Sequence, residues 1–251
     1  MNRVLTAIAA LAASLGLTAC APADEPQSPE LDREAVGEIV RAYLLENPEV
    51  IEEALIELQR RAREREEMAL RNAIASNAIR MFEDPRDPVI GRVDAPVTIV
   101  EFFDYRCSFC MVTNEWVQNT IANHGDQVRV VFKEFPIRGA ASVESSRAAL
   151  AVWKTQPDAY LRFHSDLMSS SGPLPGERID EIAAGAGVDV AVMRGAMEDE
   201  AILGHLDDVR ALAQTIGITG TPFFIIGDEI IPGADMAGMQ RALLEALEAA
   251  S

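Results

Sequence analysis

The first third of the chain alternates apolar and polar positions with the period of a helix. One apolar stripe precedes a break at Asn47-Pro48 and consists of Val36, Ile39, Val40, Tyr43 and Leu44. A second stripe follows the break with the spacing of a coiled-coil seam and consists of Ile51, Leu55, Leu58 and Ala62. Residues 60–71 are then mostly charged with alternating signs, as in a solvent-exposed rod. The pattern predicts two helices, with Asn47 as N-cap and Pro48 as first residue of the second.

From residue 89 onward the pattern changes to short apolar runs separated by helical periods. The apolar runs predict strands at 97–103, 127–135, 223–226 and 229–231. Helical periods occupy 107–123, 140–216 and 236–249. The last two strands form a hairpin across Gly227-Asp228, and the first two are parallel if the helix between them is a right-handed crossover. This order predicts an α/β domain over residues 84–251 with a helical insertion at 140–216, and the turn-forming residues 84–88 mark its start.

The N-terminus has the pattern of an export signal. Arg3 supplies a positive start, and Val4 to Leu17 form an apolar stretch too short to span a bilayer. Leu17-Thr18-Ala19-Cys20 resembles a bacterial lipobox, in which Cys20 becomes the lipidated first residue of the mature protein. Cleavage after Ala23 is the competing interpretation and would discard Cys20. We therefore expect a lipoprotein-type signal peptide at 1–20, a tether at 21–30, and a helical arm and stalk at 31–83.

Composition excludes some classes of partner and site. The 251 residues carry a formal net charge of −18, whereas nucleic-acid sites need clustered Lys and Arg. Besides Cys20 the chain has one cysteine pair, Cys107 and Cys110, and their loop is too short to staple the fold. A second cysteine pair or a His-x-x-x-His run is missing from the sequence, which disfavours structural zinc. We expect no nucleic-acid partner, no metal and no other cofactor.

The cysteine pair is the candidate for chemistry. Cys107-Ser108-Phe109-Cys110 directly follows the apolar strand and opens a helix pattern. Unpaired N–H groups at a helix N-terminus carry partial positive charge, which stabilises a thiolate. We expect Cys107 to be the more exposed thiol and Cys110, one turn further on, to be shielded. The pattern indicates disulfide exchange.

The residues around the cysteines resemble a known family. Glu-Phe-Phe-Asp-Tyr-Arg-Cys-Ser-Phe-Cys at 101–110 and Gly-Thr-Pro-Phe-Phe at 220–224 are similar to the DsbA-like branch of the thioredoxin superfamily. Residues 40–49 are similar to the oligomerisation segment of the ScsC (suppressor of copper sensitivity C) group. The resemblance covers about residues 36–249. It implies a thioredoxin fold with a helical insertion, preceded by an N-terminal helical oligomerisation arm.

The resemblance also implies roles for single residues. Cys107 is expected to attack and Cys110 to resolve the mixed disulfide. Thr221-Pro222 matches the family's cis-proline loop, where Thr221 pairs in strand fashion with the substrate. Glu101 matches a buried acid, and we expect it to accept the Cys110 proton with a pKa raised by desolvation. Lys133 either pairs with Glu101 or extends to solvent.

One position departs from the oxidases of the family. These often place a histidine immediately before the second cysteine, where it stabilises the thiolate. Phe109 stands there and carries no charge. Each pKa unit so lost below ambient pH removes roughly 30 mV of oxidising power from a two-electron couple. The departure predicts a milder oxidant, better suited to shuffling or reduction.

These observations lead to a functional hypothesis. We expect a periplasmic thiol–disulfide oxidoreductase, anchored through Cys20 or soluble, that isomerises disulfides in cysteine-containing envelope proteins and exchanges electrons with a membrane redox partner. Residues 36–62 are expected to form a homo-oligomer, although a helical hairpin folded onto its own domain is an alternative. A DsbA-type dithiol oxidase and a copper-binding envelope protein that uses the same cysteines are alternative functions.

Overall fold

The computed structural model describes residues 32–251, which divide into two units. One unit ends at Arg61, and the other comprises Ala62–Ser251. The expected signal peptide, tether and lipidated Cys20 lie outside the described residues. Within residues 32–251, no helix combines the length and the apolar character needed to cross a bilayer.

The first unit consists of helix α1 (Arg33–Glu46) and the beginning of α2 (Glu49–Ser76). The Asp32 side chain caps α1 by accepting a hydrogen bond from Glu34 N at 3.0 Å. The break occurs at Asn47-Pro48 as expected, but Asn47 has a different task. Its side-chain amide donates to Tyr43 O at 2.9 Å and so closes α1. The prediction of Asn47 as N-cap of the second helix is wrong, because an amide can also donate to the free carbonyls of the preceding helix.

Most apolar side chains of both stripes are exposed in the chain taken alone, whereas Leu44 and Ala62 are half-buried. No residue of α1 is buried within the described structure. On α2, the exposed fractions of Leu55, Ile56 and Leu58 are 55%, 57% and 58%. Leu55 and Leu58 belong to the coiled-coil stripe, whereas Ile56 lies outside it. An uncovered apolar seam of this kind is typical of a surface that associates.

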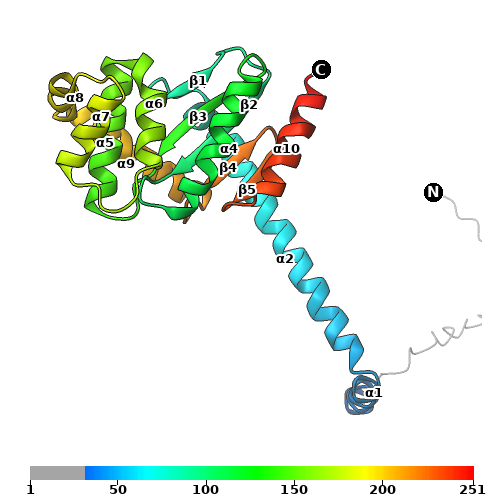
Figure 1. The fold of residues 1–251 in the computed structure, drawn as a ribbon. Helices are drawn as coiled ribbons and strands as arrows, with labels where there is room; N and C mark the ends of the chain where they lie inside the picture. Colours follow the sequence, from blue (N-terminus) through cyan, green and yellow to red (C-terminus); the bar gives the residue numbers. More distant parts are fainter. Residues whose placement is uncertain (1–31) are drawn as a thin grey trace, which may run out of the picture. The chain divides into compact units, whose positions relative to one another are not determined.

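The second unit is built on one mixed sheet, with strand order β1-β3-β2-β4-β5 within the described chain (Figure 1). The strands are β1 (Val89–Gly91), β2 (Val97–Phe103), β3 (Val128–Glu134), β4 (Phe223–Ile226) and β5 (Glu229–Pro232). β2 and β3 are parallel, and the other neighbours are antiparallel. The sequence therefore predicted the central parallel pair and the final hairpin correctly.

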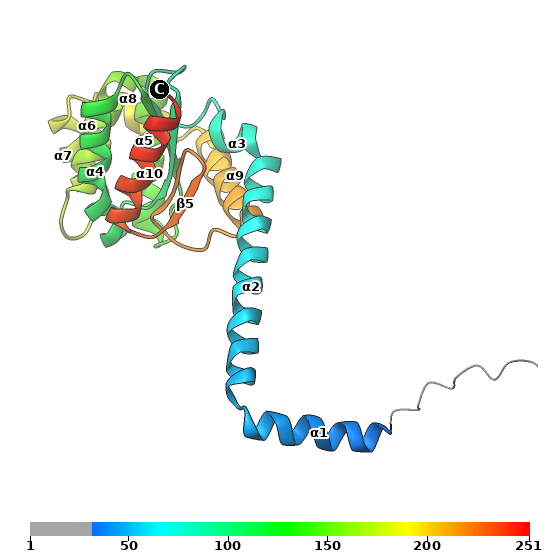
Figure 2. The same ribbon diagram turned by 90° about the vertical axis from the view of Figure 1, so that its right-hand side faces the viewer.

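Helices cover both faces of this sheet (Figures 1 and 2). α4 (Ser108–His124) and α10 (Met236–Ala249) pack on one face, together with much of the insertion. The insertion between β3 and β4 comprises α5 (Ala140–Thr155), α6 (Pro157–Met168), α7 (Gly176–Gly185), α8 (Val190–Met197) and α9 (Glu200–Ile216). The end of α2, α3 (Ala78–Phe82) and α9 pack on the other face. This is the thioredoxin fold with a helical insertion, as expected.

The alternation along the two central strands decides which side chains meet the cysteines. Ile99 and Phe103 of β2 belong to the same core cluster as Cys107 and Cys110, so Glu101 between them points to that face. Lys133 of β3 lies opposite Phe102, whose side chain packs in the core of the other face. Lys133 and Glu101 are thus on opposite faces of the sheet, and the suggested ion pair between them is wrong.

Candidate active site

The cysteine pair lies where β2 ends and α4 begins. Cys107 is the N-cap residue of α4, with extended backbone angles of φ −90° and ψ 114°. Its N–H donates to Asp104 O at 2.9 Å, and its carbonyl accepts from Met111 N at 3.1 Å. The buried strand therefore fixes Cys107 at the first turn of the helix, where backbone N–H groups are unpaired.

Both cysteines are reduced and fully buried. In its protonated form Cys107 Sγ donates to Thr221 O at 3.2 Å, and the guanidinium Nη2 of Arg138 lies 3.7 Å from the same sulfur. The exposed fraction is 0% for both cysteines, so the expectation that Cys107 would be the more exposed thiol stays a prediction. The sequence around a cysteine does not reveal that two distant loops, those of Thr221 and Arg138, close over it.

The pKa values of the two thiols are shifted in opposite directions. A hydrogen bond from Cys110 and, with smaller weight, bonds from the backbone N–H groups of Cys110 and Phe109 lower the pKa of Cys107 to about 5, although burial opposes this. Burial raises the pKa of Cys110 far above its usual range. Cys107 is therefore a thiolate at neutral pH while Cys110 keeps its proton. The helix N-terminus contributes as expected, but the neighbouring thiol contributes more.

Glu101 lies beneath the cysteines and is 2% exposed. Burial, followed by the nearby charge of Cys107, raises its pKa to about 8. Within residues 32–251, no Lys, Arg or His forms an ion pair with it, because Lys133 on the other face pairs with Asp87 instead. Glu101 can therefore exchange a proton near neutral pH, which is the property needed for its expected role.

The Thr221–Pro222 peptide is cis, as the resemblance implies. It precedes β4, and the Pro222 carbonyl accepts from Gly233 N at 2.8 Å. A shallow groove of about 270 Å³ runs past it, lined by residues 217–223 with Pro232 and Gly233. The structure thus brings Cys107, Cys110, Thr221 and Pro222 together, with Glu101 below them.

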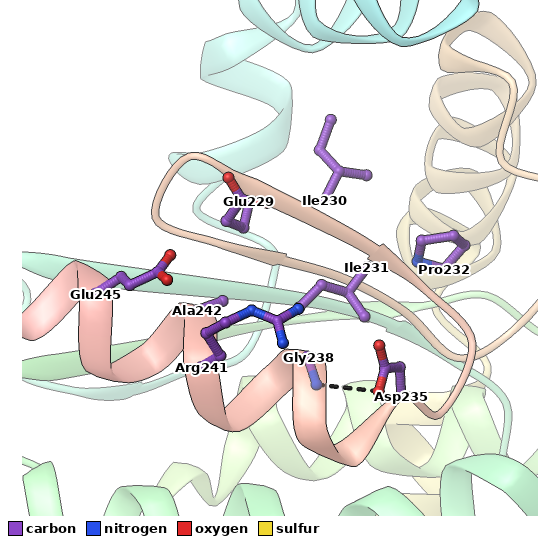
Figure 3. Close-up of a pocket in the computed structure, with 9 residues that line it drawn as sticks. All are labelled: Glu229, Ile230, Ile231, Pro232, Asp235, Gly238, Arg241, Ala242 and Glu245. Carbon is purple, nitrogen blue, oxygen red and sulfur yellow. Dashed lines mark hydrogen bonds between the residues drawn. The ribbon is translucent and has the colours of Figure 1, made fainter. Parts of the chain in front are cut away.

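A separate cavity of about 300 Å³ lies between β5 and α10 (Figure 3). Its lining includes Arg241 and Glu245 of α10 and Glu229 of β5. Asp235, also in the lining, is engaged as the cap of α10 and accepts from Gly238 N at 3.0 Å. The lining contains no predicted site residue, so this cavity is distinct from the redox site.

Comparison with known proteins decides the family. Residues 98–245 match the family model described as the DSBA-like thioredoxin domain. The chain belongs to the DsbA-like thioredoxin family. Residues 32–65 additionally match the model described as the copper resistance protein ScsC N-terminal domain. Both resemblances found in the sequence are confirmed.

Individual relatives agree with this assignment. The crystal structure of Proteus mirabilis ScsC in a transitional conformation is 30% identical, with a TM-score of 0.65, covering 86% of this chain and 97% of that one. The thiol-disulfide exchange protein alpha-DsbA2 from Wolbachia pipientis is 28% identical, with a TM-score of 0.67, covering 71% and 96%. Disulfide bond formation protein D of Bacillus subtilis is 29% identical over 57% of this chain and 69% of its own length. The chain also matches, at 25% identity, 27% of the length of an Na(+)/H(+) antiporter NhaA 1 of Mycolicibacterium gilvum.

As a DsbA-like protein the chain is a thiol–disulfide oxidoreductase. The acidities of its thiols suit that activity. A thiolate at Cys107 can attack a disulfide at neutral pH and is also a good leaving group. A neighbour that retains its proton does not compete for the same substrate.

Sequence reasoning missed the residue that holds the DsbA-like site together, Asp104. Its buried carboxylate accepts from Arg106 N and Ser142 Oγ at one oxygen, at 2.7 and 2.8 Å. The other oxygen accepts from Ile137 N and Arg138 N at 2.8 and 2.9 Å. Asp104 thereby joins the cysteine loop to the loop that follows β3. An acidic residue between a buried strand and a cysteine pair was the available signal.

A second buried polar cluster was also missed. Tyr105 Oη donates to Glu134 Oε1 at 3.0 Å and lies 3.0 Å from His164 Nδ1. Burial lowers the pKa of His164 to about 3 and raises that of Glu134. Tyr105 lies in the loop before α4, Glu134 in β3 and His164 in α6, so no local sequence pattern connects them. His164 is therefore a neutral core residue.

Proposed function

We propose that the protein is a periplasmic disulfide isomerase that acts on cysteine-containing envelope proteins. The observation that carries the proposal is the combination, in one chain, of a stabilised Cys107 thiolate with an exposed apolar seam on a segment that matches the ScsC N-terminal domain. An isomerase must attack wrong disulfides in its reduced form, and a thiolate at neutral pH permits this. Two or more sites held by one seam can act on the same misfolded chain.

Each site residue has a place in the proposed reaction. Cys107 thiolate attacks a substrate disulfide and forms a mixed disulfide, releasing a substrate thiolate. Cys110 then attacks the Cys107 sulfur if rearrangement stalls, and the second substrate thiolate leaves. Glu101 accepts the Cys110 proton as this attack begins. The main chain of Thr221, beside the groove at Pro222, pairs with the substrate backbone.

Location and partners complete the proposal. Export through residues 1–20 and lipidation at Cys20 would tether the protein to a membrane, with a membrane redox partner keeping Cys107 and Cys110 reduced. A Cys20→Ser variant should lose radiolabelled lipid and appear in the soluble periplasmic fraction. A Cys110→Ala variant should retain clients as mixed disulfides, which identifies envelope substrates and their redox state.

The decisive experiment compares two substitutions on α2. Leu58→Glu places a charge in the coiled-coil seam, whereas Ile56→Glu places it beside the seam at nearly equal exposure, 58% against 57%. We expect the wild type and Ile56→Glu to be oligomers that refold scrambled ribonuclease. Leu58→Glu should be a monomer that still exchanges disulfides with a small dithiol peptide but refolds scrambled ribonuclease several-fold more slowly.

Each alternative gives a different outcome. A wild-type monomer by light scattering would remove the support for isomerisation and favour a DsbA-type dithiol oxidase. Tight Cu(I) binding without ribonuclease refolding would favour the copper-binding alternative, because two thiolates are soft ligands.

A further inference from the structure

The loop between β3 and α5 brings a cation to the reactive sulfur. Arg138 is exposed, but its guanidinium Nη2 donates toward Cys107 Sγ at 3.7 Å. The main chain of the loop is fixed, because Ile137 N and Arg138 N both donate to the Asp104 carboxylate. Gly139 then turns the chain into α5 with φ 103°, a region open mainly to glycine. The backbone therefore holds the Cα of Arg138 in place next to the cysteine loop, and the side chain reaches the sulfur from there.

Arg138 differs from the other arginine near the sulfur. Arg106 precedes Cys107 in the chain, yet its Nη1 donates to Gly172 O at 2.6 Å and is turned toward the insertion. The remaining ionisable groups close to Cys107 are Cys110 of α4, Glu101 of β2 and Asp104, none of which carries positive charge. Among the described residues, Arg138 is thus the cation hydrogen-bonded to the reactive sulfur.

We propose that Arg138 is a catalytic residue that stabilises the Cys107 thiolate, in the role for which Phe109 offers no charge. This inference rests on the proposed role of Cys107. A guanidinium hydrogen bond to an anionic acceptor is stronger than one to a neutral acceptor. In a disulfide or a mixed disulfide the Cys107 sulfur is neutral, so Arg138 favours the states in which Cys107 is a free thiolate.

The electron balance shows which steps respond. In oxidation, a substrate thiolate attacks Cys107 Sγ, the Cys107–Cys110 bond breaks, and Cys110 leaves and takes up a proton. The second substrate thiolate then attacks the substrate sulfur of the mixed disulfide, the substrate disulfide forms, and Cys107 leaves as a thiolate. Two electrons have passed from the substrate to the cysteine pair. Arg138 assists the departure of Cys107 here and, in the reverse direction, populates the attacking thiolate.

Three full-length variants test this inference. Arg138→Leu removes the cation, Arg138→Lys keeps a point charge without the planar guanidinium, and Arg106→Leu removes the neighbouring cation that does not contact the sulfur. For Arg138→Leu we expect the equilibrium with glutathione to shift toward the protein disulfide by about three- to tenfold, equivalent to about 15–30 mV. The midpoint of the ultraviolet thiolate absorbance should move upward by about 0.5–1 pH unit. Arg138→Lys should lie between wild type and Arg138→Leu, and Arg106→Leu should stay within about twofold of wild type.

The outcomes separate this inference from the function it rests on. If the wild type exchanges disulfides and Arg138→Leu leaves both equilibrium and midpoint unchanged, the role of Arg138 is wrong while the function stands. If Arg106→Leu shifts both as much as Arg138→Leu, the effect is one of general surface charge, which also overturns the role. If the wild type itself fails to exchange disulfides, the proposed function fails first. Arg138→Gln, also neutral but polar, replaces Arg138→Leu should the latter unfold at a lower temperature.

Discussion

The two faces of the sheet bury acids in opposite ways. On the face of α3 and α9, the Asp87 carboxylate pairs with Lys133 at one oxygen and lies 2.9 Å from His205 Nε2 at the other. Lys133 also donates to Arg80 O, which joins β3 to the end of α3. On the face of α4, Glu101 is equally buried and has no cation partner within residues 32–251. Asp87 is therefore part of a buried ionic cluster with Lys133 and His205, whereas Glu101 is free to gain and lose a proton.

The difference follows from what burial costs. A charged group that is buried away from water needs a partner of opposite charge. Without one, its pKa shifts so that the uncharged form is favoured. Asp87 meets this requirement through two side chains from distant elements. Glu101 does not, and the cost appears as its raised pKa. The partners of a buried acid thus distinguish a structural acid such as Asp87 from a functional one such as Glu101. The exposed fractions of the two acids do not, because they are nearly the same, 1% and 2%.

The largest expected effect belongs to the redox face. Cys107→Ser should reduce the rate of disulfide exchange by at least about 10³-fold, because a hydroxyl cannot form the mixed disulfide. Thermal unfolding should change little, since the substitution is nearly isosteric. In the wild type, the rate of alkylation of Cys107 should rise with pH through a midpoint near 5, in keeping with its lowered pKa. A midpoint near that of a free cysteine would contradict the thiolate on which the redox face depends.

On the face of α3 and α9, a substitution in the ionic cluster should affect stability alone. Asp87→Asn leaves Lys133 buried without its counter-charge and should destabilise the protein by about 3–5 kcal/mol in urea unfolding. The folded protein should exchange disulfides at the wild-type rate, because Asp87 lies on the opposite face from the cysteines. Asp208→Asn breaks the exposed pair with Arg86 and serves as the control, with a loss below about 1 kcal/mol. A lower exchange rate in Asp87→Asn would mean that the two faces are coupled.

This comparison also marks how far the sequence could be interpreted. Apolar runs and a two-residue period identified β2, β3 and the inward position of Glu101, because these depend on local alternation. The partner of Lys133 could not be identified in the same way, because Asp87 lies 46 residues away from it in the sequence. His205, the other partner of Asp87, is 118 residues away from Asp87. The direction of the Lys133 side chain was nonetheless available. The parallel register sets it opposite Phe102 and hence away from Glu101.

Similar reasons explain which parts of the candidate active site could be predicted from the sequence. The spacing of Cys107 and Cys110 at a strand end indicated the chemistry, and the Thr-Pro pair indicated the loop that covers it. The burial of Cys107 and its contact with Arg138 depend on loops that lie 31 and 114 residues away in sequence. Only the folded chain shows that Asp104 fixes the first of these loops. The chemistry of the cysteine pair was therefore predictable, whereas the contacts of Thr221 and Arg138 with the Cys107 sulfur were not.

The unpaired acid predicts a pH-dependent stability. Glu101 has a pKa of about 8 in the folded protein and an ordinary value of 4.5, so the folded state binds the extra proton between these pH values. Stability from this group is complete below about pH 4.5 and is lost as pH rises through about 8. Glu101→Gln removes the loss, and its stability relative to wild type should increase by about 2–4 kcal/mol over this window. Urea unfolding of both reduced proteins at several pH values measures it.

The same variant should also slow resolution. A glutamine cannot accept the Cys110 proton, so the mixed disulfide should persist several-fold longer in stopped-flow measurements. If the stability difference were flat with pH, Glu101 would have a partner after all, and the contrast between the faces would disappear.

Asp104 provides an intermediate case, and the smallest expected effect. It is as buried as Asp87, but its four hydrogen bonds come from three backbone N–H groups and the Ser142 hydroxyl rather than from cations. Ser142→Ala removes one of these donors and should cost about 1 kcal/mol in urea unfolding. Ser145→Ala is the matched control on α5, because its hydroxyl bonds to Ala141 O within the helix, and its loss should be smaller. Equal losses would mean that the backbone donors alone satisfy Asp104, so that a buried acid can be held without any side-chain partner and the distinction between paired and unpaired acids would have to include the main chain.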